Sequence, residues 1–269
     1  MGSARGNAGP LVRERRLRAR YSQMDLAFDV GISPRHLSFV ELGKSRPSPE
    51  LLIAIAAHLD VPPRERNEWL LAAGHAPRYP HSSLDAPALA QVRSSLRELL
   101  DAHDPYPAVV VDRCWNIQLA NRAAGRLTAS LPEHLQGPEP NVFRIALHPD
   151  GLAGRSGNLA DWSPYLLRSL ELTAARTDDA ALRRLLDETR TWPGLQPHAS
   201  RSRLPDSDPV QPVITWKVTT GGHELAFFTM MSTFGTPLDI TLFELTVELL
   251  FPADAATRKV LQEWAATGA

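Results

Sequence analysis

The segment from Ser22 to Leu42 carries the strongest structural signal in the chain. Ser22 is a good N-cap, and Asp25 places a carboxylate in the first turn, where the helix dipole favours negative charge. Gly31 follows the apolar residues of this helix, where a left-handed residue ends a helix without steric cost. The pattern therefore predicts a helix that begins at Gln23 and stops at Gly31.

A second helix is predicted one residue later. Ser33 can cap it, Pro34 suits its first position, and Ile32 can pack on Leu37 as a hydrophobic staple. Two short helices joined by a tight glycine-containing turn describe a helix-turn-helix, whose second helix enters the major groove of DNA. A generic helical hairpin is the alternative, but the caps, the glycine and the apolar spacing together favour the DNA-binding motif.

The stretch SQMDLAFDVGISPRHLSFVELGKSRPSPELLIAIAAHLDVP resembles the phage-repressor-like (Xre/Cro) helix-turn-helix family. The resemblance covers about residues 10–75 and implies a double-stranded DNA operator as partner. It implies that Gln23 clamps a phosphate and that the second helix faces the bases. The predicted DNA-binding residues are Gln23, Ser33, Pro34, Arg35, His36, Ser38, Phe39, Lys44 and Arg46.

Individual roles follow from side-chain chemistry. The guanidinium of Arg35 matches the O6 and N7 acceptors of guanine, and Phe39 can touch a thymine methyl group. Lys44 and Arg46 lie just past the second helix, where they can meet the phosphate backbone and fix the register without reading sequence. Solvated surface charge is the alternative for each of these cations.

The distribution of charge agrees with a DNA-binding N-terminal part. The whole chain has a net charge of −1, yet residues 1–80 contain 12 Lys and Arg against 8 Asp and Glu. The remainder is correspondingly acidic. A basic segment beside an acidic one is what local binding of a polyanion requires, although ordinary surface charge would give a similar balance.

A length of 269 residues favours two domains. We predict a five-helix helix-turn-helix domain over residues 10–76, a linker with a connecting helix over 77–104, and a second domain over 105–269. The linker contains the turn-forming stretch RYPHSSLDAP, and apolar residues recur at helical spacing after Pro87.

The second domain mixes helices and strands. Two short strands are predicted at AVVVD and WNIQLAN. A hairpin is predicted from the strand VITWKVTT, the turn GG and the strand HELAFFTMMS. DITLFELTVELLF predicts another strand before a C-terminal helix that begins near Asp254. These elements predict an α+β domain with an antiparallel sheet.

The opening of this domain, YPAVVVDRCWNIQLANRAAGRL, resembles PAS-type sensor domains. Together with the N-terminal domain, it resembles the MmyB-like ligand-binding domain family over roughly residues 100–255. The motifs are YPAVVVDRCWNIQLAN, NVFRIALHPDG and FGTPLDITLFELTVELLFPAD. The resemblance implies a PAS-like cavity for a small apolar molecule such as a fatty acid, and a homodimer whose DNA affinity responds to that ligand.

Ligand pockets are mainly apolar with a few polar anchors. The residues predicted to line this pocket are Trp115, Phe143, Trp162, Leu166, Leu170, Phe227 and Met230. Arg144 or Arg168 is the candidate anchor for a ligand carboxylate. An ordinary filled core is the alternative interpretation of the apolar set.

Signals for catalysis and metal binding are missing from the sequence. It contains no GxxxxGK[ST], strand-linked GxGxxG, HExxH or GxSxG motif. The nine histidines lack the short spacings that build a metal site on one element, and Cys114 is the only cysteine. We therefore predict no catalytic residue, no metal ligand and no cofactor beyond a possible bound fatty acid.

The start of the chain lacks the apolar core of a secretory signal, and charges, Gly235 and Pro237 interrupt the most apolar stretch. We therefore expect a cytoplasmic protein without a membrane span. The main hypothesis is a ligand-responsive transcription regulator. One alternative makes the second domain a protein-interaction module without a metabolite, and another makes the chain an enzyme with a DNA-binding appendage.

Overall fold

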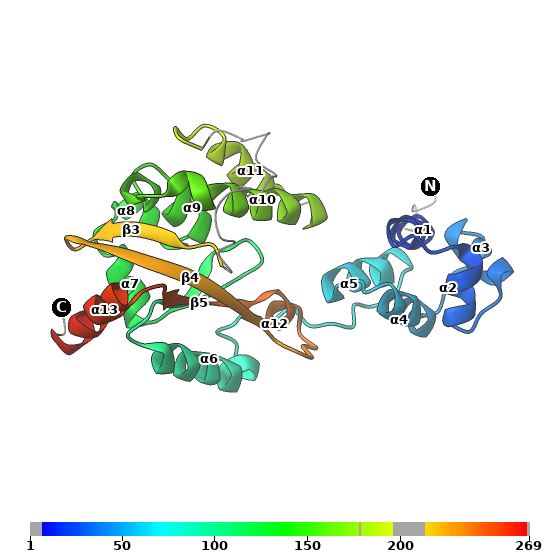
Figure 1. Cartoon of the computed structure of the whole chain (residues 1–269). Helices are drawn as coiled ribbons and strands as arrows, with labels where there is room; N and C mark the ends of the chain where they lie inside the picture. Colours follow the sequence, from blue (N-terminus) through cyan, green and yellow to red (C-terminus); the bar gives the residue numbers. More distant parts are fainter. Residues whose placement is uncertain (1–6, 178, 196–212, 268–269) are drawn as a thin grey trace. The chain divides into compact units, whose positions relative to one another are not determined.

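The computed structural model describes residues 7–177, 179–195 and 213–267 (Figure 1). The described residues form two compact units. The first contains the chain up to Ala86 together with residues 235–243, and the second contains residues 87–234 and the chain from Glu244 onward.

The first unit contains five α-helices before residue 76, as predicted. They are α1 (Gly9–Arg18), α2 (Gln23–Asp29), α3 (Pro34–Glu41), α4 (Pro49–His58) and α5 (Pro63–Ala72). Three of them begin at a serine, Ser22, Ser33 or Ser48, whose hydroxyl oxygen accepts the backbone N–H three residues later. These bonds satisfy donors that have no partner in the first turn of a helix.

The turn between α2 and α3 has the predicted glycine geometry. Gly31 has a φ of 72°, the left-handed conformation that costs other residues steric strain. The apolar faces of the helices then meet in one core, which buries Ala8, Val12, Leu26, Ala27, Leu37, Leu52, Ile55, Ala56, Leu59, Val61, Trp69, Leu70 and Ala73. The staple residue Ile32 packs against this core.

The second unit is built on a five-stranded antiparallel sheet, which confirms the predicted α+β class. Its strands are β1 (Ala108–Val111), β2 (Ile117–Ala120), β3 (Trp216–Thr220), β4 (His223–Thr233) and β5 (Thr246–Pro252). Their order across the sheet is β2-β1-β5-β4-β3. The β3–β4 hairpin turns through Gly221 and Gly222, both with positive φ, as the GG signal predicts.

The remaining helices precede, separate and follow these strands. They are η1 (Pro87–Leu89), α6 (Ala90–His103), α7 (Arg122–Thr128), α8 (Glu133–Gln136), α9 (Val142–Leu147), η2 (Ala153–Arg155), α10 (Leu159–Thr177), α11 (Ala180–Thr189), α12 (Ile240–Glu244) and α13 (Ala255–Thr267). Figure 1 shows α9 and α10 on one side of the sheet and α6 on the other. Among the described residues, no helix has the length and apolar character needed to cross a bilayer.

One prediction about local structure was wrong. The first half of DITLFELTVELLF is the short helix α12, and only the second half is the strand β5. The Asp239 carboxylate accepts the N–H of Thr241 at 2.8 Å, and the N–H of Ile240 donates to the carbonyl of Pro80 at 2.8 Å. These hydrogen bonds outweigh the strand preference of the Ile, Thr and Phe side chains.

Candidate functional site

The outer side of α3 carries a small cluster of cations around one aromatic ring. Arg35 and Phe39 are one helical turn apart and both exposed, and the guanidinium carbon lies 5.4 Å from the ring centroid. The ammonium nitrogen of Lys44, just past the helix, lies 6.0 Å from the same centroid. Phe39 therefore holds two positive groups on the surface that the sequence predicts to face DNA.

A buried ion pair lies beneath this surface. Arg16 donates to both carboxylate oxygens of Glu41, from Nε at 2.6 Å and from Nη2 at 2.9 Å, and its Nη1 donates to the carbonyl of Tyr21. Gln23 donates to Glu41 at 2.6 Å. Burial raises the pKa of Glu41, but the bonds from Arg16 and Gln23 outweigh it and hold this pKa below its ordinary value. The pair fixes α1, α2 and α3 to one another.

The structure places the other predicted DNA-binding residues as follows. Ser33 and Pro34 are exposed at the start of α3, and His36 and Ser38 are half-buried along it. Arg46 is exposed, and its Nη2 donates to the carbonyl of Gly74 at 2.7 Å. That bond fixes the loop after α3 to the end of α5.

The interior of the second unit brings together most of the predicted pocket residues. Trp115, Phe143, Trp162 and Leu170 are buried in one cluster, and Leu166 packs against it. Phe227 belongs to a second cluster. The two clusters share Trp216, which sequence reasoning missed: its ring centroid lies 6.0 Å from that of Trp162 and 5.6 Å from that of Phe227.

Comparison with protein families identifies both units. A helix-turn-helix model matches residues 12–66, and a model described as the MmyB-like transcription regulator ligand binding domain matches residues 92–263. The chain belongs to the MmyB-like transcription regulators. It therefore combines a DNA-binding helix-turn-helix with a ligand-binding domain, as the sequence predicts.

Other comparisons add little to this assignment. Among solved structures, this MmyB-like chain is similar to an RNA-binding light-oxygen-voltage receptor, with 13% identity and a TM-score of 0.30. The match covers 97% of the chain and 62% of that receptor, so the chain spans less than two thirds of its length. No curated protein matches.

Three residues proposed for the ligand site lie outside the two clusters of the MmyB-like domain. Met230 is 54% exposed on β4. The guanidinium of Arg144 forms a bidentate pair with Glu188, with a closest distance of 2.8 Å. Arg168 is exposed and faces Glu171 one turn along α10, at 3.7 Å. Both arginines thus have carboxylate partners within the protein.

Two polar groups of the MmyB-like domain are buried among apolar side chains. The indole Nε1 of Trp216 has no hydrogen-bond partner within the described part of the chain. Glu248 on β5 exposes 7% of its surface and lies between Val109 and Met231 in the sheet register. Burial raises the pKa of its carboxyl group to about 7. Glu248 interrupts the apolar strand TVELLFP, which was the available sequence signal.

A pocket of about 310 Å³ lies elsewhere in the MmyB-like domain. Its lining is largely polar and consists of Asn116, His134, Leu135, Gly137, Pro138, Glu139, Asn141 and Arg144. Of the predicted ligand-binding residues, only Arg144 belongs to this lining. The pocket and the apolar clusters are therefore separate features of the domain.

Cys114 packs against the first cluster of the MmyB-like domain. Burial, followed by the nearby carboxylates of Asp179 and Asp112, raises the pKa of its thiol to about 11. Because the thiolate is the reactive form of cysteine, this thiol is a poor nucleophile at neutral pH.

Proposed function

We propose that this regulator reads a double-stranded DNA operator through α3 and that a small apolar ligand in its C-terminal domain changes the DNA affinity. The observation that carries the DNA-reading step is the exposed cluster of Arg35, Phe39 and Lys44 above the buried Arg16–Glu41 pair. Arg35 contacts a guanine, Phe39 a thymine methyl and Lys44 a phosphate. The remaining predicted contacts come from Gln23, Ser33, Pro34, His36, Ser38 and Arg46.

The ligand in this proposal is a fatty acid or a similar chain with one polar end. Its apolar part lies among the side chains where the two clusters meet, near Trp162, Trp216 and Phe227. The N–H of Trp216, which has no partner among the described residues, supports this position, because a ligand carboxylate would satisfy a buried donor that otherwise costs free energy. Trp216 thus replaces Arg144 and Arg168 as the preferred anchor.

The working form in this proposal is a cytoplasmic homodimer. Two-fold symmetry places two copies of α3 on half-sites about one helical turn of DNA apart. Ligand binding shifts the population between a form that fits this spacing and one that does not. A monomer at micromolar concentration that binds a single half-site tightly would contradict the dimer.

The first test is native mass spectrometry of the purified protein, followed by denaturing extraction and identification of any small molecule. We expect a dimer mass with a bound lipid. Removal of the lipid should then change the affinity for an operator selected from random DNA, measured by fluorescence anisotropy. An unchanged affinity in lipid-free and lipid-bound protein would contradict ligand control.

A second candidate function is a protein-interaction module. Phe143, Leu170 and Phe227 are fully buried among other side chains, and a filled core of this kind serves a domain that binds a partner protein on its surface. Purified protein without any bound small molecule, together with DNA affinity that responds only to a protein partner, would favour this function.

An enzyme is the least supported possibility. The single cysteine has a raised pKa, and the family assignments describe DNA binding and ligand binding. We propose that the C-terminal domain binds its ligand without transforming it. Recovery of a chemically altered lipid after incubation with the protein would contradict this proposal.

A further inference from the structure

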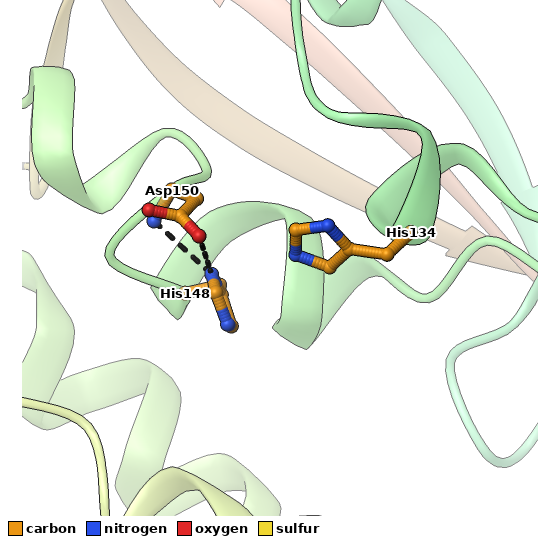
Figure 2. Close-up of side chains that lie close together, drawn as sticks. All are labelled: His134, His148 and Asp150. Carbon is orange, nitrogen blue, oxygen red and sulfur yellow. Dashed lines mark hydrogen bonds and ion pairs between the residues drawn. The ribbon is translucent and has the colours of Figure 1, made fainter.

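The C-terminal domain brings together three potential metal ligands from separate positions in the chain. His134 lies in α8, His148 is the C-cap of α9, and Asp150 lies in the following turn. One ligand atom from each lies within 4.8 Å of the other two, and Figure 2 shows the three side chains facing a common space. We propose that they bind a divalent transition metal ion, with Zn²⁺ as the first candidate.

The donor set decides the class of metal. Two imidazoles and one carboxylate suit zinc and its neighbours in the first transition row, whereas magnesium and calcium prefer sites built of oxygen. Three protein ligands leave one position of a tetrahedral Zn²⁺ ion open for water or a small anion. The proposed site therefore resembles zinc sites with an open position more than closed structural sites.

The distances need only modest adjustment. The Nδ1 atom of His148 and the Oδ2 atom of Asp150 are 3.9 Å apart. Zinc bonds of about 2.0–2.2 Å place two ligands of a tetrahedral site about 3.4 Å apart. His134 and Asp150 are exposed, so their side chains can close on the ion without disturbing the core.

The tautomer and the packing of His148 are defined. Its Nδ1 atom accepts the N–H of Asp150 at 3.0 Å, which assigns the ring proton to Nε2 and leaves the lone pair on Nδ1. Its ring packs edge-on against His134 and Trp192, with centroid distances of 5.2 and 5.0 Å. A metal at Nδ1 would replace the hydrogen bond from Asp150, so the N–H of Asp150 must turn away from the ring, toward solvent, when the ion binds.

The turn after His148 is tight. The N–H of Gly151 donates to the carbonyl of His148 at 2.9 Å. A Cβ atom at Gly151 would lie 2.4 Å from the carbonyl oxygen of Ile145, so this tight turn requires glycine. The turn follows α9, which delivers Phe143 and Leu147 into the first cluster. Metal binding would therefore tie α8 to a helix that is anchored in the core.

The pocket of about 310 Å³ adjoins the site, because His134 lines it. This space can hold a water or a small anion on the open position of the metal. The acidic Glu139 and the cationic Arg144 also line the pocket, so it offers polar partners to such a ligand. The inference concerns a second site of the domain and is independent of the apolar ligand proposed above.

The test is isothermal titration calorimetry of tag-free, chelator-treated full-length protein with ZnCl₂ in a buffer that does not bind metal. We expect one Zn²⁺ per chain. His134→Ala and Asp150→Ala should each weaken binding about tenfold or more, while far-UV circular dichroism stays unchanged. His148 packs against Trp192, so these two exposed positions give the cleaner variants.

The matched control is His223→Ala, which removes an exposed histidine of β4 outside the cluster and should leave Zn²⁺ affinity unchanged. Co²⁺ substitution should give the intense visible bands of a tetrahedral site in the wild type and lose them in the double variant His134→Ala/Asp150→Ala. Absence of binding, or equal binding by the wild type and the double variant, would overturn the proposal.

Discussion

The contribution of the buried Arg16–Glu41 ion pair to the stability of the helix-turn-helix unit can be measured with a single substitution. Glu41 is 4% exposed and Arg16 is 6% exposed, so loss of either partner leaves a charge in the core. We expect Glu41→Ala to lower the free energy of unfolding of this unit by about 3 kcal/mol. Urea unfolding followed by circular dichroism measures the loss.

Glu14→Ala is the matched control, because its pair with Arg18 is exposed and should contribute little to the free energy of unfolding. Similar losses in Glu14→Ala and Glu41→Ala would contradict the stabilising role of the buried pair.

The pH dependence of stability gives a second check on Glu41. The pKa of Glu41 is lowered in the folded protein, so its contribution is present above the unfolded pKa and is lost as pH falls through the folded pKa.

Glu248 gives the opposite pH dependence. Burial raises its pKa from 4.5 to about 7, so the folded state holds a proton that the unfolded state releases. Stability should fall as pH rises from about 4.5 to 7, by up to about 3 kcal/mol, and stay level above that range. Glu248→Gln should remove this fall and be more stable than wild type at pH 8.

The measurement for Glu248 is urea unfolding of both proteins at pH 5 and pH 8. The exposed Glu263 provides the control variant Glu263→Gln, which should keep the pH dependence of the wild type. Identical pH profiles for wild type and Glu248→Gln would show that another group is responsible.

Two cations near Phe39 should differ in their effect on DNA binding. Arg35→Ala should cost about 1–3 kcal/mol and relax specificity at one base pair, because the side chain reads a base edge. Lys44→Ala should weaken binding to all DNA sequences by a similar factor. It should also lower the salt dependence of the DNA affinity by the equivalent of about one phosphate contact. Anisotropy titrations on operator and random DNA at several salt concentrations separate the two; equal losses on both DNAs for Arg35→Ala would refute base reading.

At the scale of elements, predictions succeeded where the signal was local. Ser22, Ser33 and Gly31 mark helix ends through bonds and dihedral angles within a few residues, so α2 and α3 could be predicted from the sequence alone. α12 was missed because its residues favour a strand, while its hydrogen bond to Pro80 comes from far along the chain. Long-range partners of this kind are invisible to spacing and propensity.

Substitutions at two glycines test how the local backbone conformation affects stability. Gly31 has a φ of 72°, and a Cβ added there would meet no atom within 4 Å, so Gly31→Ala should cost about 1 kcal/mol from backbone strain alone. Gly125 lies inside α7 with equally open space, so Gly125→Ala should stabilise its domain by about 0.5–1 kcal/mol. Thermal unfolding by calorimetry measures both, and changes of the same sign would contradict the role of φ.

For the whole molecule, composition and motifs were enough to predict two functional parts but not their interiors. The predicted aromatic residues do meet, because large apolar side chains must be buried somewhere in a domain of this size. The contact of His134 with His148, and the position of Trp216 between two clusters, depend on how distant segments fold together. Spacing along the chain does not determine such contacts.

The segment that links the helix-turn-helix to the rest of the chain has a specific partner. The hydroxyl of Thr241 in α12 donates to the carbonyl of Ser82, beside the bond from Ile240 to Pro80. α12 leads directly into β5, which forms part of the ligand-binding domain. In the function proposed above, a ligand that shifts β5 would act on the linker through these two hydrogen bonds.

If ligand control takes this route, Thr241→Val should weaken it, because valine keeps the volume of threonine and removes the donor. The proposed coupling is the ratio of operator affinities in lipid-free and palmitate-loaded protein, and we expect this ratio to fall about fivefold, equivalent to about 1 kcal/mol. Lipid-free DNA affinity should stay unchanged. Thr173→Val, which removes a bond within α10 alone, should leave the ratio intact; equal ratios in Thr241→Val and wild type would rule out this connection.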